Sequence, residues 1–131
     1  MKILKVGIIC LFLVSFSILL FSSIAAKNGF MNHSVISASN GAIEGLTVSL
    51  AAELAPEIKV NCIAPSLSKS KIAEPMLKNT TIAEGIAKAH PLKRLGEGKD
   101  SAALAKFLLT EDSSWVTGQI IAVDGGRSKL S

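Results

Sequence analysis

Short apolar runs alternate with amphipathic stretches along this chain, and together they predict a repeat of strands and helices. Three runs, at residues 17–21, 58–64 and 119–123, are mostly apolar and are bounded by small polar residues, Pro or Gly. This pattern is typical of parallel strands that are covered on both faces. Residues 40–54, between the first two runs, repeat apolar side chains at helical spacing. The residues that fall on one face of this predicted helix are Ile43, Leu46, Leu50 and Leu54.

Capping residues set the limits of the first predicted helix. Ser39 and Asn40 are the candidates for its N-terminus, with Glu44 in an early turn, because short polar side chains cap the free amides of a first turn. Pro56 ends the helix. The following strand stops at Pro65, which has no amide to donate to a sheet.

Two more helical segments precede the third strand. Residues 70–88 predict helical pieces that are broken at Pro75, and Asp100 or Ser101 is expected to cap a helix over residues 100–109. The order strand, helix, strand, helix, strand predicts an α/β fold with right-handed crossovers. We therefore expect a partial doubly wound (Rossmann-like) parallel sheet of three strands with crossover helices, preceded by an apolar N-terminal segment.

Two incompatible structures fit the apolar N-terminus. The run from Val6 to Ala26 has no charged residue, matches the roughly 20 residues that a membrane helix needs, and follows two lysines. It therefore predicts a signal peptide or a membrane anchor. The alternative assigns residues 17–21 to a buried parallel strand, and the same side chains cannot serve both structures.

The division of the chain follows from this conflict. Residues 1–16 form the apolar N-terminal segment, which together with residues 17–26 is the possible anchor or signal. Residues 17–131 form one domain, and a domain of this size buries only a modest core. No internal repeat or low-complexity linker divides it further.

Composition and charge exclude two classes of function. The formal net charge of +4 comes partly from the chain ends, and three of the five Phe lie in the apolar N-terminus, so no basic and aromatic surface for nucleic acid is predicted. Cys10 and Cys62 are expected to be small buried hydrophobic residues. Neither His33 nor His90 has further ligands at metal spacing, so no metal site is predicted.

Four ordered segments of the chain are similar to one known family. Residues 37–56, 60–65, 90–96 and 114–126 resemble the active-site helix, the strand and turn after it, and the closing segments of short-chain dehydrogenase/reductases. The resemblance covers about one hundred residues of the chain, and it is to the C-terminal half of the family. It implies a Rossmann-like sheet and an NAD(P)-dependent oxidoreductase of the ketoacyl reductase type.

The resemblance also locates the family's catalytic residues. The family's Tyr-x-x-x-Lys pattern falls on Ile36 and Asn40, and its catalytic serine falls on Ser23. In the family, tyrosine donates the proton when hydride reaches a carbonyl, and lysine lowers the pKa of its hydroxyl. This chain contains no tyrosine. Ile36 has no proton to give and Asn40 has no charge, so the chain is expected to be inactive alone.

The cofactor implied by the resemblance is NAD(P). Its nicotinamide end would meet the turn after the second strand, at Pro65, Ser66, Ser68 and Ser70. No glycine-rich turn between a strand and a helix, where amides would bind the pyrophosphate, occurs in the sequence. Binding of the dinucleotide by this chain alone is therefore expected to be weak.

Three functions stay open from the sequence. The first is a truncated or degenerate short-chain dehydrogenase/reductase. The second is a non-catalytic partner of a full-length relative, in a homo- or hetero-oligomer formed through the helix from Asn40 to Leu54. The third is a small membrane-anchored protein, held through the segment from Val6 to Ala26. The family resemblance implies a cytoplasmic location, and the apolar N-terminus predicts a membrane as the alternative.

Overall fold

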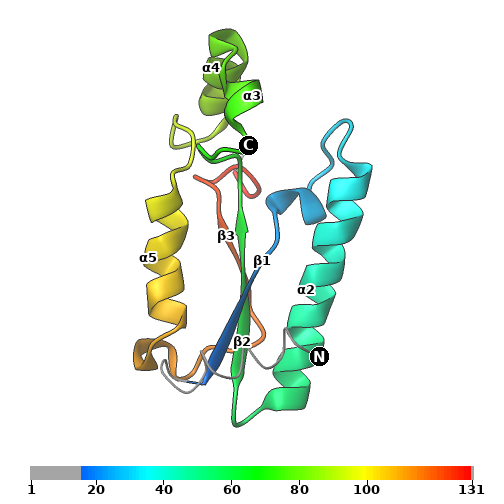
Figure 1. The fold of residues 1–131 in the computed structure, drawn as a ribbon, viewed down its shortest axis with the longest axis vertical. Helices are drawn as coiled ribbons and strands as arrows, with labels where there is room; N and C mark the ends of the chain where they lie inside the picture. The colour runs from blue at the N-terminus through cyan, green and yellow to red at the C-terminus, as the bar shows by residue number, and fades with distance from the viewer. Residues whose placement is uncertain (1–15, 131) are drawn as a thin grey trace.

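A parallel three-stranded sheet with helices on both faces forms the body of the molecule (Figure 1). The structure, a computed structural model, describes residues 16–130. Strands β1 (Ser17–Phe21), β2 (Lys59–Pro65) and β3 (Ile120–Val123) lie in the order β1-β2-β3, and both pairings are parallel. This confirms the predicted α/β class and the partial doubly wound sheet.

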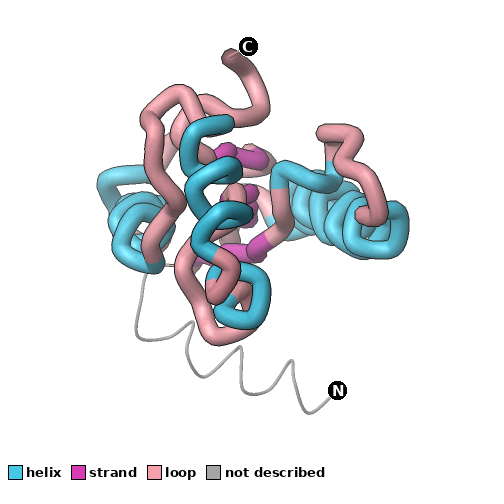
Figure 2. Tube along the Cα trace, turned by 90° about the horizontal axis from the view of Figure 1, so that it is seen from above, coloured by secondary structure: helices cyan, strands magenta, loops and turns pink. Residues whose placement is uncertain are grey.

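Two long helices cover the sheet. Helix α2 (Ser34–Leu54) connects β1 to β2, and α5 (Gly98–Leu108) precedes β3. Seen from above, these two helices lie on opposite sides of the strands (Figure 2). The remaining elements are short: η1 (Ile24–Ala26), α3 (Glu74–Leu77), α4 (Thr80–Ala89) and η2 (Glu111–Ser113).

Strand β2 is the centre of the core. It has a strand on each side and a helix over each face, so Val60, Cys62 and Ile63 are completely buried. Burial at this level explains why the strand is mostly apolar rather than alternating. Cys62 is a buried free thiol, as predicted, whereas Cys10 lies outside the described residues. Leu108 of α5 completes the core on the second face.

Two polar residues of β2 connect the strand to the segment before β3. The buried Asn61 amide donates to the Val116 carbonyl (2.9 Å), and its oxygen accepts from the Gln119 amide (3.0 Å). The Lys59 ammonium donates to the Ser113 hydroxyl (2.8 Å) and carbonyl (3.2 Å). Because buried polar groups need partners, these bonds fix where the chain turns into β3.

Helix α2 begins earlier than the sequence indicated. We expected Ser39 or Asn40 to cap it, but its first residue is Ser34 and its N-cap is His33. The Ser39 hydroxyl and the Asn40 amide instead donate to the Ile36 carbonyl, inside the helix. Short polar side chains satisfy their own helix in this way as well as capping it. The C-terminal end, just before Pro56, is as predicted.

The buried face of α2 also differs from the apolar face that the spacing suggested. Glu44, Thr47 and Ala51 are the buried residues, and Leu46 is 49 % exposed. Glu44 is buried because its carboxylate accepts from the Ser22 hydroxyl (3.0 Å) and forms an ion pair with Lys27 (3.3 Å). A charged residue with such partners can lie inside, although its type alone predicts the surface.

Pro75 and Asp100 occupy other positions in their helices than the sequence predicted. Pro75 lies in the first turn of α3, where proline starts a helix, and does not break one. The interruption comes later, at Asn79, whose side chain caps α4 by accepting from the Ile82 amide. The N-cap of α5 is Glu97, and Asp100 is the third helical residue.

The N-terminal segment is a strand where the structure describes it. Residues 17–21 form β1, the parallel strand that the alternative interpretation expected, but its side chains are only partly buried; the short helix η1 at residues 24–26 was not predicted. No helix within residues 16–130 is both long and apolar enough to cross a membrane. The rest of the proposed anchor, residues 6–15, lies outside the described residues.

Replacing Glu44 by Ala is expected to lower the free energy of unfolding by about 2 kcal/mol, because it leaves the buried Ser22 hydroxyl without its charged acceptor. Urea unfolding measures this loss. Glu53→Ala, an exposed carboxylate on the same helix, is the matched control and should change stability by less than about 0.5 kcal/mol. Equal losses at the two positions would contradict the structural role of Glu44.

Candidate functional site

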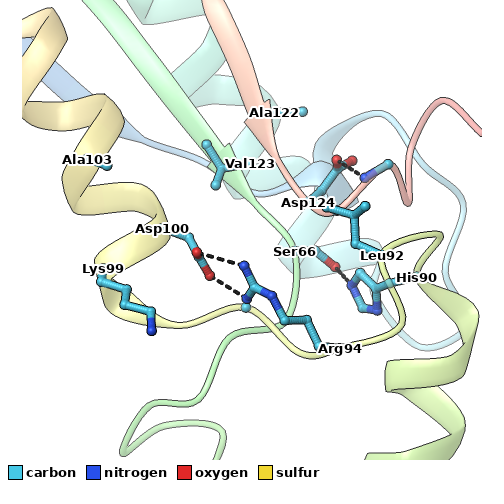
Figure 3. Close-up of a pocket in the computed structure, with 13 residues that line it drawn as sticks. Ser66, His90, Leu92, Arg94, Lys99, Asp100, Ala103, Ala122, Val123 and Asp124 are labelled. Carbon is cyan, nitrogen blue, oxygen red and sulfur yellow. Dashed lines mark hydrogen bonds and ion pairs between the residues drawn. The ribbon is translucent and has the colours of Figure 1, made fainter.

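The carboxyl ends of β2 and β3 meet the amino end of α5 around a cavity of about 650 Å³ (Figure 3). Ligands bind at the carboxyl ends of parallel strands because loops and helix termini converge there. Polar and charged side chains line this cavity beside an apolar wall. The residues that give it its chemical character are Ser66, His90, Leu92, Arg94, Asp100 and Asp124.

Ser66 and His90 form a hydrogen-bonded pair in the cavity wall. The Ser66 hydroxyl lies 2.8 Å from Nε2 of His90, and Nδ1 of His90 lies 2.7 Å from the Ile86 carbonyl. A carbonyl only accepts, so Nδ1 carries a proton. In the neutral imidazole, Nε2 is therefore the acceptor and Ser66 is the donor. His90 is only 2 % exposed, so its ring is held in one orientation.

Arg94 and Asp100 form a bidentate ion pair on the opposite wall. The two distances between guanidinium nitrogens and carboxylate oxygens are 2.7 and 2.8 Å. One oxygen of Asp100 also accepts from the Glu97 amide at the start of α5 (2.8 Å). Hydrogen bonds from Arg94 and from this amide hold the pKa of the Asp100 carboxyl well below its usual range.

Asp124 organises the turn that follows β3. Its carboxylate accepts from the amides of Gly126 (2.9 Å) and Ser128 (2.8 Å). Burial raises the pKa of this carboxyl, but the bonds from Ser128 and Gly126 outweigh burial, and the pKa lies below its ordinary value. Gly125 has φ = 58°, which favours glycine, and its backbone packs closely against Leu92 and His90.

The structure places the four residues of the expected cofactor turn at the end of β2, with their side chains engaged internally. Pro65 is the last residue of β2. Besides Ser66, the Ser68 hydroxyl donates to the Ser66 carbonyl (3.1 Å), and Ser70 accepts from the Ala73 amide (3.2 Å). Gly96 lies beside Ser68, so closely that any side chain at this glycine would meet the Ser68 hydroxyl.

The three expected catalytic positions lie near η1 and α2, away from the cavity lining. The Ser23 hydroxyl caps η1 by accepting from the Ala25 amide (3.1 Å). Ile36 is 45 % exposed, and the side-chain amide of the half-buried Asn40 donates to the Ile36 carbonyl (2.8 Å). Within residues 16–130, no hydrogen bond joins any of these three side chains to a titratable side chain.

Of the residues that line the cavity, sequence reasoning proposed Ser66 as a cofactor-binding residue but missed His90, Arg94 and Asp124. His90 looked isolated because its partner Ser66 is 24 positions away, and Arg94 and Asp124 carried no separate signal. Asp100 was recognised only as a possible cap. The one clue was its spacing from Arg94, six residues across a predicted loop and helix start.

Within residues 16–130, no three His, Cys, Asp or Glu side chains gather as a metal site.

Comparison with known proteins identifies relatives along most of the chain. A family model described as Enoyl-(Acyl carrier protein) reductase matches residues 10–128. Human dehydrogenase/reductase SDR family member 2, mitochondrial, is 38 % identical over 115 residues, which cover 87 % of this chain and 41 % of that protein. A tropinone reductase homologue of Arabidopsis thaliana is 38 % identical over 111 residues, covering 84 % of this chain and 42 % of the homologue.

Solved structures show the same partial coverage. A short-chain type dehydrogenase/reductase from Mycobacterium ulcerans superposes with a TM-score of 0.81 at 34 % identity, over 87 % of this chain and 42 % of that one. ElxO with NADP bound gives a TM-score of 0.78 at 31 % identity, over 85 % of this chain and 46 % of ElxO. The chain thus spans about two fifths of the length of the curated relatives that it matches.

Replacing Asp100 by Asn is expected to lower the urea midpoint at neutral pH, because Arg94 and the Glu97 amide bind the carboxylate form. The pKa of Asp100 is lower in the folded than in the unfolded chain, where it is about 3.9. The ionised Asp100 carboxylate therefore stabilises the folded chain above about pH 4, and this stabilisation is lost as the pH falls through the pKa that Asp100 has in the folded chain.

The test compares urea midpoints of the wild type and Asp100→Asn over a pH series. The difference between them should narrow below about pH 4. Asp112→Asn, at an exposed carboxylate in η2, is the control and should show a small difference at every pH. If the difference in urea midpoint between the wild type and Asp100→Asn stayed constant down to about pH 3, the stabilising role of the Asp100 carboxylate would be contradicted.

Proposed function

The chain belongs to the short-chain dehydrogenase/reductase family, and on that premise we propose that it carries the nicotinamide-side half of an NAD(P)-dependent oxidoreductase of the ketoacyl reductase type, without turning over substrate by itself. This proposal rests on the residues that α2 carries at two of the family's catalytic positions. At the positions of the family's tyrosine and lysine, α2 carries Ile36 and Asn40, and the Asn40 amide is bonded to its own helix. Neither side chain supplies or activates a proton.

The N-termini of α4 and α5 do not suit the phosphates of a dinucleotide. A pyrophosphate requires free amides at a helix N-terminus with little negative charge nearby. The first turn of α5 carries Asp100 next to Glu97, and the side chain of Asn79 caps α4 by accepting from the Ile82 amide. These two termini therefore do not fit a phosphate group.

Titration of the full chain with NAD(H) and NADP(H) by calorimetry tests this proposal. We expect no binding in the micromolar range, because phosphate contacts supply much of the affinity in dinucleotide sites and the N-termini of α4 and α5 do not offer them. Micromolar binding would overturn the proposal.

The double variant Ile36→Tyr with Asn40→Lys separates loss of the acid from loss of the cofactor site. On α2, Ile36 is 45 % exposed and Asn40 is half-buried. We expect no oxidation of NADPH above background with a ketoacyl ester. The reason is that positioning of cofactor against substrate, which supplies roughly 7–11 kcal/mol of catalysis, is still absent. Turnover by the double variant would show that the acid alone was missing.

A second candidate function, a non-catalytic oligomer partner, is favoured by the outer face of α2. Val35 is 80 % exposed and Leu46 is 49 % exposed. Side chains added at Gly41 or Gly45 would meet nothing within 4 Å. Of the two carboxylates on the helix, Glu44 is buried and only Glu53 is exposed.

We propose a second copy of this chain as the occupant of that face. A face with a single exposed charge brings few like charges together across a two-fold axis, and its small residues allow close approach of two helices. Leu46→Lys is therefore expected to weaken self-association at least tenfold, measured by sedimentation velocity over a concentration series.

Ile82→Lys is the matched control for this test. Ile82 is 45 % exposed on α4, so the substitution adds the same charge to a similarly exposed apolar residue elsewhere. It should leave the association constant unchanged. A wild-type chain that sediments as a monomer at every concentration would exclude this second candidate.

A further inference from the structure

We propose that Ser66 is a nucleophile activated by His90, and that the cavity at the ends of β2 and β3 accepts small acyl esters. This activity goes beyond the oxidoreductase assignment and uses none of the family's catalytic positions. It rests on the distances between Ser66, His90 and Ile86, and on the cavity that Ser66 and His90 line.

The hydrogen bonds give each group the role that acyl transfer requires. Nucleophilic catalysis by serine needs a base within about 2.6–3.2 Å that is oriented by a third group. Nε2 of His90 lies 2.8 Å from the Ser66 hydroxyl, and the Ile86 carbonyl holds the other nitrogen at 2.7 Å. The carbonyl fixes the tautomer in which Nε2 accepts a proton, as a carboxylate does in serine proteases.

The position of His90 favours the charge that forms on it during the reaction. His90 is the C-cap of α4, a helix of 10 residues, and its ring binds a carbonyl of the last turn. The carboxyl end of a helix carries partial negative charge, which stabilises a nearby imidazolium. The Asp124 carboxylate also lines the cavity.

An acyl group has both room and an amide near the serine. The lining of the cavity, whose volume is about 650 Å³, includes apolar side chains, among them Leu92, Ala103 and Val123. Figure 3 shows Ser66 and His90 directed toward one another in its wall. The Leu67 amide, next along the chain from the serine, donates no hydrogen bond within residues 16–130. An amide in that position commonly stabilises an oxyanion.

The reaction is balanced with water as the only co-reactant. The Ser66 oxygen attacks the ester carbonyl while its proton moves to Nε2 of His90. The bond from the carbonyl carbon to the alcohol oxygen breaks, and His90 returns the proton to the leaving alcohol. Water then attacks the acyl-serine, gives one proton to His90, and releases the acid as the serine regains its proton.

Labelling with a fluorophosphonate probe tests the proposal on the full chain. We expect one adduct by intact mass, located on Ser66 by peptide mapping, together with release of nitrophenol from p-nitrophenyl butyrate. Location of the adduct needs no variant, so it does not depend on a variant's folding. A wild-type chain that takes no adduct, or takes it on another residue, would overturn the proposal.

Three variants distinguish a catalytic pair from a structural hydrogen bond. Ser66→Gly, which removes the hydroxyl, should abolish the adduct and the esterase rate. His90→Gln should lower the labelling rate by about 100-fold or more, since it removes the base but keeps the serine. Ser114→Ala should keep the wild-type rate, because Ser114 is an exposed serine at the end of η2 that does not line the cavity.

Circular dichroism and thermal unfolding accompany each variant. A folded His90→Gln chain that labels at the wild-type rate would show that the Ser66–His90 bond is structural only. If His90→Gln does not fold, Ser66→Gly and the position of the wild-type adduct decide the question. An adduct on Ser66 that Ser66→Gly removes supports the proposal in that case as well.

Discussion

The burial of β2 on all four sides is the constraint on which the rest of the structure depends. A parallel strand between two neighbours has its backbone groups satisfied in the sheet, so its side chains need apolar cover on both faces. Helices α2 and α5 provide that cover from opposite sides (Figures 1 and 2). Because all strands run in one direction, their carboxyl ends and the loops that follow them gather at one edge, and the cavity forms there.

Buried polar residues fix the position of each element on this scaffold. Glu44 holds α2 to the end of β1, Asn61 holds the segment before β3, and His90 holds the end of α4 to the end of β2. Apolar contacts are not directional, so they would tolerate small shifts of these elements. Hydrogen bonds to buried groups are directional, and leaving one unmade costs roughly 1–3 kcal/mol. Each of these three bonds therefore selects one arrangement.

The order of elements was predictable from the sequence, because covered strands are apolar runs and prolines mark several boundaries. The buried face of α2 was not predictable. Glu44 reads as a surface residue until Ser22, 22 positions earlier, is seen to donate to it. His90 reads as an isolated histidine for the same reason. Family resemblance identified Ser23, Ile36 and Asn40 by position, but a position does not report a contact, and the structure shows what each side chain bonds.

The family's proton-donor positions and the proposed nucleophile lie in different parts of the fold. Ser23, Ile36 and Asn40 lie near η1 and α2. The cavity at Ser66 is built entirely by residues between the end of β2 and the turn after β3. Its geometry is fixed by bonds inside that stretch, such as Ser66 to His90 and Arg94 to Asp100. A change on α2 that removes the proton donor therefore leaves this cavity, and the hydrogen bond between Ser66 and His90, intact.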